Sequence, residues 1–150
     1  MKDNKWIWLD CDGTIADLYA VKDWLPKLRA EDPSPYAQAA PLVNMNTLAR
    51  KLNKLQREGW KIGIISWLSK TSTPAYDEAV TAAKMWWLRK HLKSVHFDKI
   101  NIVSYGVNKW EVCGAGILFD DEDRNRNNWQ GNAYHPNMMM DILNELMKGE

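Results

Sequence analysis

Apolar runs alternate with amphipathic stretches along the chain, and this alternation predicts the order of strands and helices. Four short runs, at 6–9, 60–65, 100–103 and 116–119, are mostly apolar and have the length of buried strands. A helix-like pattern separates the first three of them, and another follows the last. Strands that alternate with helices are typical of an α/β protein with a parallel sheet flanked by helices.

Three stripes of apolar side chains at helical spacing predict helices that pack on this sheet. Three leucines form the first stripe, with Asn46 or Thr47 available as its cap and Gly59 at its end. The second stripe begins at about Asp77, and the third follows Pro136. We expect the tryptophans of the strands and of the second stripe to lie in the core, namely Trp6, Trp8, Trp60, Trp86 and Trp87.

Residues 16–41 interrupt the alternation with four prolines and scattered aromatic residues. The segment is too short to be a domain, so we expect a small helical cap over the strand edge. A chain of 150 residues is long enough to bury roughly 70% of its unfolded surface as one domain. The sequence therefore predicts a single domain over 1–150 with a cap at about 16–41.

The first strand ends in two carboxylates, Asp10 and Asp12, followed by Gly13. The i, i+2 spacing points both side chains to one face. An Asp-Gly turn between strands is the ordinary interpretation of such a pair. However, paired negative charge at a strand end is costly unless a cation or a reacting group compensates it. The pair is therefore a candidate site.

The later strands also end in polar groups that phosphoryl chemistry needs. Ser66 follows the second strand, Lys109 lies in the polar loop after the third, and Asp120 and Asp121 follow the fourth. The carboxyl ends of parallel strands meet at one edge of a sheet, so these groups are expected to converge. Together they predict a site that handles a phosphate group.

This set of motifs resembles that of the haloacid dehalogenase-like hydrolases, and the match runs from Asp10 to Asp121. These enzymes have an Asp-x-Asp-Gly-Thr loop, a strand that ends in Ser or Thr, a lysine and an acidic pair. The resemblance implies a Rossmann-like fold and a Mg²⁺ ion held by Asp10, Asp120 and the backbone carbonyl of Asp12. Asp121 would be a direct ligand or a partner of one.

The chemistry of each group suggests its role in such an enzyme. Asp10 would attack phosphorus and form an aspartyl-phosphate, while Asp12 would act as general acid and then as general base. We expect the phosphate itself to be bound by Thr14, Ser66, Trp67 and Lys109.

A second resemblance is to the small 5'(3')-deoxyribonucleotidases, carried by residues 85–92 (MWWLRKHL) and 119–124 (FDDEDR). It implies a nucleoside monophosphate as substrate. Aromatic residues of the cap and of the second motif would stack on the base, namely Tyr19, Trp24, Tyr36 and Trp67.

Other charged residues were weighed against these candidates. Lys84, within a predicted helix, is expected to be a solvated side chain, and Lys70 a loop cation. Arg124 and Arg126 either reach a phosphate or balance the acidic residues before them, and the sequence favours neither.

Composition narrows the setting. The formal net charge of +1 gives no strong signal for nucleic acid. Two cysteines form no disulfide framework, and no apolar run approaches a membrane span or a signal core. We therefore expect a cytoplasmic enzyme with a small phosphorylated substrate. Two alternatives are a polynucleotide end phosphatase, against which the neutral charge counts, and a protein that binds a nucleotide without turnover.

Overall fold

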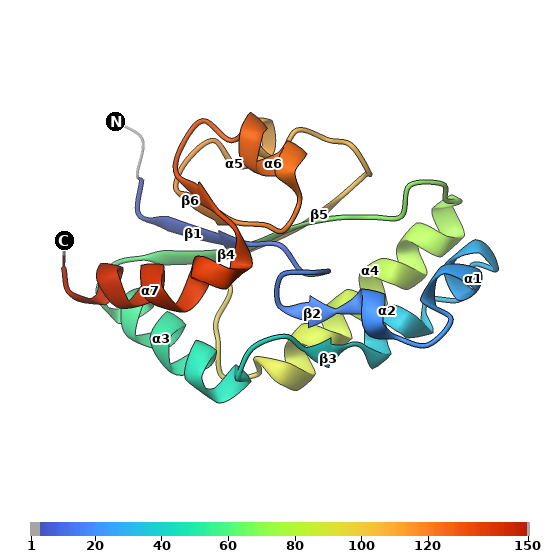
Figure 1. The fold of residues 1–150 in the computed structure, drawn as a ribbon, viewed down its shortest axis with the longest axis horizontal. Coiled ribbons are helices and arrows are strands. Elements are labelled where there is room, and N and C mark those ends of the chain that lie inside the picture. Colours follow the sequence, from blue (N-terminus) through green and yellow to red (C-terminus); the bar gives the residue numbers. More distant parts are fainter. Residues whose placement is uncertain (1–3, 150) are drawn as a thin grey trace.

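A parallel five-stranded sheet forms the centre of the molecule (Figure 1). The computed structural model describes residues 4–149. Within this sheet all neighbouring strands pair in parallel, which confirms the predicted Rossmann-like α/β class. In spatial order the strands are β5 (Lys99–Val103), β4 (Lys61–Trp67), β1 (Trp6–Leu9), β6 (Ile117–Phe119) and β7 (Ala133–Tyr134).

Helices cover both faces of the sheet, as Figure 1 shows. One face is covered by α3 (Met45–Arg57), α4 (Pro74–His91) and α7 (Met139–Met147). On the other lie two short helices, α5 (Lys109–Cys113) and α6 (Asp123–Asn128). A short 3-10 turn (Pro136–Met138) leads into α7. The leucine stripe of α3 is fully buried against the sheet, and each such side chain contributes about 1.5–3 kcal/mol.

The strand order places a topological switch point at β1. The chain passes from β1 to β4 and β5 on one side, and later to β6 and β7 on the other. Close packing supports this centre: Trp8 lies opposite Gly63, where an added Cβ would be only 2.4 Å from the indole ring. In open α/β sheets, ligands bind at the carboxyl ends of strands beside such a point.

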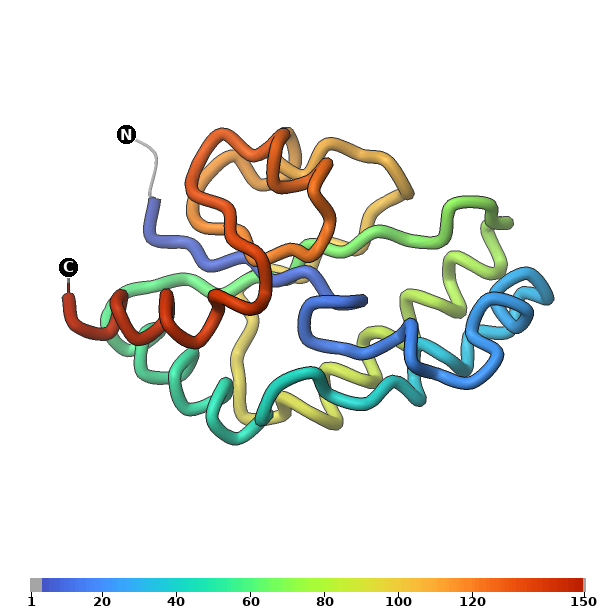
Figure 2. Tube along the Cα trace, viewed as in Figure 1, coloured from blue at the N-terminus to red at the C-terminus, as the bar shows by residue number. Residues whose placement is uncertain are grey.

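Residues 16–41 form a compact segment beside α4, at the end of the molecule far from α7 (Figure 2). Trp87 in α4 donates from Nε1 to the carbonyl of Ala39 at 2.7 Å. Leu18 and Tyr36 share a buried cluster with two side chains of α4. The elements of the segment are β2 (Ala16–Asp17), a 3-10 turn (Leu18–Ala20), α1 (Trp24–Arg29), α2 (Ser34–Gln38) and β3 (Ala40–Pro41).

Three local expectations were wrong. The cap of α3 is Asn44, whose side chain accepts from Thr47 N at 3.0 Å, so Thr47 lies inside the helix. Trp86 is 47% exposed instead of buried, because it lies on the outer side of α4. Lys109 begins the helix α5, where a loop was expected; both α5 and α6 are too short to show a periodic pattern.

Within residues 4–149, no helix has both the length and the apolar character that a membrane span requires.

Candidate active site

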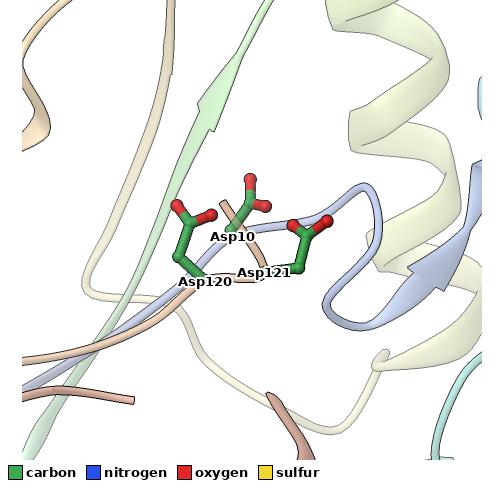
Figure 3. A group of neighbouring side chains, drawn as sticks. All are labelled: Asp10, Asp120 and Asp121. Carbon is green, nitrogen blue, oxygen red and sulfur yellow. The ribbon is translucent and has the colours of Figure 1, made fainter. Parts of the chain in front are cut away.

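Three carboxylates converge at the carboxyl edge of the sheet, as Figure 3 shows. Asp10 follows β1, and Asp120 and Asp121 follow β6, the neighbour of β1. Each offers one oxygen, and these oxygens lie within 4.8 Å of one another. Asp120 is fully buried and Asp10 is 7% exposed. Burial, together with the charge of Asp10, raises the pKa of both Asp120 and Asp121.

This cluster has the donor set that Mg²⁺ prefers, since hard divalent cations take carboxylate and carbonyl oxygens. Its buried negative charge needs more compensation than one lysine gives. The backbone at Gly13 also leaves space for the carboxylate of Asp121. Gly13 has φ +81°, and an added Cβ there would lie 2.2 Å from Asp121 Oδ2. The residues therefore fit a metal ion held between Asp10, Asp120 and Asp121.

Lys109 is the cation of the cluster. Its Nζ donates to Asp120 Oδ2 at 2.6 Å, to Ile65 O at 3.1 Å and to Asp10 Oδ1 at 3.2 Å. The side chain is 2% exposed. Burial works against the charged ammonium, but the two carboxylates outweigh it and raise the pKa of Lys109. The lysine is therefore firmly cationic beside the expected nucleophile.

Further hydrogen bonds hold the acidic pair in place. Asn125, 4% exposed on α6, donates to Asp120 Oδ2 at 3.1 Å, and Glu122 N donates to Oδ1 at 2.9 Å. Asn125 also lines the cavity described below, and the sequence analysis missed it. Its position five residues after Asp120, in a polar stretch between two strands, was the available signal.

Thr14 is fully buried among the same carboxylates. Its hydroxyl lies 3.2 Å from Asp10 Oδ2 and 3.4 Å from Asp121 Oδ1, and it accepts from Asp121 N at 3.2 Å. The cavity lining does not include it. In this structure Thr14 thus orients the acidic groups, while its predicted contact with phosphate stays a prediction.

Asp12 faces a different cation from Asp10. Its Oδ2 lies 2.9 Å from Nζ of Lys84. Burial raises the pKa of Asp12, and the charge of Lys84 works in the opposite direction. Lys84 was expected to be solvated, and this was wrong: the side chain is 2% exposed and also contacts Ser66. Lys84 is four residues after the buried Val80, so a lysine within the apolar stripe of α4 was the signal.

A cavity of about 330 Å³ opens above these groups. Its floor is polar and includes Asp10, Asp12 and Lys109, so the two carboxylates of the first motif do share a face. Its walls are largely apolar and aromatic. All four predicted aromatic residues line it, together with one that was missed, Tyr105: the set is Tyr19, Trp24, Tyr36, Trp67 and Tyr105. Ser66 is fully buried in β4 and is not part of the lining.

Trp67 contacts both the loop before Lys109 and two cations. Its Nε1 donates to Val107 O at 2.9 Å, and its ring centroid lies 4.8 Å from that of Tyr105. Lys109 Nζ lies 5.5 Å and the Arg124 guanidinium 4.7 Å from the ring centroid. The indole therefore braces the loop that leads to Lys109 in addition to lining the cavity.

The two arginines after the acidic pair have separate partners. Arg126 pairs with Asp123 and donates to the carbonyl of Asp120 at 2.9 Å, which matches the charge-balancing interpretation. Arg124 is exposed and stacks on Trp67. Neither lines the cavity. Lys70 is an exposed loop cation, as predicted, and its Nζ lies 6.0 Å from the ring centroid of Tyr105.

Comparison with known proteins gives only weak structural similarity. No protein-family model matches the sequence, and neither does any curated protein. A crystal structure of D,D-heptose 1,7-bisphosphate phosphatase from Burkholderia thailandensis is similar, with a TM-score of 0.47 and 14% sequence identity. The match covers 82% of this chain and 70% of that one.

Proposed function

We propose that this protein is a Mg²⁺-dependent phosphomonoesterase of the haloacid dehalogenase-like type. The observation that carries the proposal is the convergence of three carboxylates from two adjacent strand ends, beside a buried lysine and beneath a cavity. Asp12 opens into the same cavity. A site built only to bind a phosphorylated ligand has no need of this additional carboxylate.

The reaction follows from the positions of the two aspartates. A carboxylate oxygen of Asp10 attacks phosphorus, and the ester P–O bond breaks as the bond to Asp10 forms. Asp12 gives its proton to the departing alcohol oxygen. Water then attacks the aspartyl-phosphate, Asp12 takes a proton from it, and inorganic phosphate leaves while Asp10 is restored.

The remaining groups manage charge. Lys109 lies against Asp10 and would offset negative charge on the phosphate as it approaches. Asp10, Asp120 and the backbone carbonyl of Asp12 would hold Mg²⁺, with Asp121 beside it. When bound, the ion supplies Lewis-acid stabilisation of charge on the phosphoryl oxygens. Without that cation, the acidic floor would repel a phosphate dianion.

The substrate we propose is a nucleoside monophosphate. Its support is the contrast between a charged floor and aromatic walls, which include Tyr19 and Trp24 from the cap segment. Aromatic side chains stack on nucleobases with about 1–3 kcal/mol per base.

Phosphate release from a panel of substrates tests the proposal directly. The panel contains nucleoside monophosphates, sugar phosphates and an oligonucleotide with a terminal phosphate, each with Mg²⁺ and with a chelator. We expect Mg²⁺-dependent release, fastest from the monophosphates. Asp10→Asn, nearly isosteric but not nucleophilic, should lower turnover by at least about 10³-fold. The proposal fails if the wild type binds nucleotides but releases no phosphate, or if Asp10→Asn keeps more than about a tenth of the activity.

A further inference from the structure

Lys84 has no part in the motifs from which the function was proposed, yet it is one of the most completely bonded side chains at the site. Its Nζ donates to Trp67 O at 2.6 Å and to Ser66 Oγ at 2.7 Å, and lies 2.9 Å from Asp12 Oδ2. A lysine ammonium has three protons, and here each has an acceptor. Burying the charge is costly without such partners.

The direction of these bonds restricts what each partner can do. An ammonium only donates, so Ser66 Oγ must act as acceptor toward Lys84, and its own proton points elsewhere. Oδ2 of Asp12 is likewise the oxygen that Lys84 holds. The second oxygen, Oδ1, is then the one that a leaving group in the cavity would meet.

Lys84 also touches the cap segment. Its Nζ lies 5.2 Å from the ring centroid of Tyr36, whose hydroxyl lies 3.0 Å from Ser69 Oγ. The lysine is thus fixed from three sides: by β4, by the loop after β1 and by α2. One residue of α4 therefore contacts the expected general acid, Asp12, the expected phosphate-binding hydroxyl, Ser66, and an aromatic residue of the cavity wall.

We propose that Lys84 is a positioning residue for the phosphoryl-transfer step, which fixes the Asp12 carboxylate and the Ser66 hydroxyl in their working orientations. This inference rests on the proposed phosphatase function. Lys84 neither forms a bond to substrate nor moves a proton. It acts through Asp12 and Ser66, and it contacts these groups rather than the three clustered carboxylates.

The first test removes the charge while keeping most of the length of the side chain. We expect Lys84→Met to lower kcat for an alkyl phosphate by about 10- to 100-fold, a part of a full general-acid contribution. The Mg²⁺ concentration for half-maximal activity should stay within about twofold of the wild-type value, because the clustered carboxylates contact Lys109 and not Lys84. Lys84→Arg should recover part of the loss. The matched control is Lys90→Met, an exposed lysine of the same helix, which should change kcat by less than about twofold.

A double-mutant cycle then separates positioning from a structural role. If Lys84 acts through Asp12, most of the effect of Lys84→Met should vanish when Asp12 is already Asn. An equal loss in both backgrounds would overturn the proposal. Lys84→Met alone leaves Asp12 buried without its cation and could fail to fold. In that case the variant that combines Asp12→Asn with Lys84→Met is measured instead, because it buries neither charge. Activity far below that of Asp12→Asn alone would contradict the proposal.

Binding of tungstate, a tetrahedral analogue of phosphate, separates this inference from the proposed function. Calorimetry with Mg²⁺ present should show about tenfold weaker tungstate binding to Lys84→Met and to Ser66→Ala, with no further loss in the combined variant. Tungstate binding that follows this pattern without any turnover would reject the phosphatase and retain the positioning of Ser66. Equal affinity in wild type and Lys84→Met, with unchanged kcat, would reject the positioning alone. No tungstate binding and no turnover would reject both.

Discussion

Two buried lysines flank the loop after β1, and they differ in what surrounds them. Lys109 lies between two carboxylates of the acidic cluster, so its main effect is to neutralise charge. Lys84 meets one carboxylate, one hydroxyl and one carbonyl, so its main effect is to fix directions. Both side chains are 2% exposed. The comparison shows that equal burial of the same residue type can serve charge balance on one side and orientation on the other.

The difference predicts different failures on the two sides. Damage near Lys109 should affect metal binding, because the three carboxylates are its neighbours. Damage near Lys84 should affect proton transfer while leaving the metal in place. Each of the following experiments either separates the two sides or would show that they act as one.

The largest effect is expected at Asp12, on the Lys84 side. Asp12→Asn should lower turnover of an alkyl phosphate by roughly 10²–10⁴-fold, because the amide cannot protonate the leaving oxygen. A nitrophenyl phosphate, whose leaving group needs little protonation, should suffer less. Steady-state kinetics with both substrates measures this. Equal losses for the two substrates would mean that Asp12 is not the general acid.

Gly13→Ala probes the Lys109 side. The new Cβ would collide with the carboxylate of Asp121, so we expect Mg²⁺ activation to need about 10- to 100-fold more metal. The matched control is Gly59→Ala. Gly59 also has a positive φ, of +101°, but an added Cβ there meets nothing within 4 Å. Both variants carry backbone strain, and only Gly13→Ala should change the metal requirement; a similar change in Gly59→Ala would contradict the steric explanation.

The aromatic wall allows a comparison of two tryptophans. Trp24→Ala should raise KM for a nucleoside monophosphate by roughly 5- to 150-fold, with little change for a phosphate that lacks a base. Trp67→Ala should lower activity on both substrates, because this ring also braces the loop before Lys109. Trp67→Phe keeps a ring and should retain more activity. A uniform loss in Trp24→Ala, accompanied by lower thermal stability, would indicate packing damage instead of a lost base contact.

The smallest expected effect is the pH dependence of stabilisation by Mg²⁺. The pKa values of Asp120 and Asp121 are raised by burial and by Asp10. In the metal-free protein, their contribution to stability is therefore present below their ordinary pKa, near 4, and is lost as pH rises through the raised values. Mg²⁺ binds the deprotonated form. Saturating Mg²⁺ should raise Tm by on the order of 5 °C at pH 8 and by less at pH 5. A larger gain at pH 5 would contradict the assigned ligands.

The sequence was sufficient for most of the fold and for the acidic floor of the site. Apolar runs that end in polar residues mark strand ends, and a parallel sheet brings those ends together whatever the side chains in between. Asp10, Asp120 and Lys109 therefore came together as predicted. Tyr19 and Trp24 lie in the cavity wall, although whether they contact a base stays a prediction.

The contacts that the sequence did not predict depend on which way individual side chains of helices and loops point. Lys84 shares a face of α4 with Val80 and Trp87, but an apolar stripe does not by itself show which polar groups the lysine contacts. Asn125 lies in a six-residue helix that is too short for a periodic signal. Thr14 was assigned to phosphate, and in the structure its hydroxyl bonds to carboxylates from two separate strand ends. The contact between Thr14 and Asp121 joins residues 107 positions apart, so it follows from tertiary structure and not from a local pattern.

Cys11 lies between Asp10 and Asp12 in the loop after β1, and its thiol can report on the movement of that loop. Its thiol is 3% exposed in the core, and burial raises its pKa to about 12. Alkylating reagents attack the thiolate, so the closed loop protects this sulfur almost completely. In a Cys113→Ser background, the rate of alkylation at Cys11 would then measure how often the loop after β1 opens by local unfolding. Ligands that brace the loop would register as slower labelling, even when no product is formed.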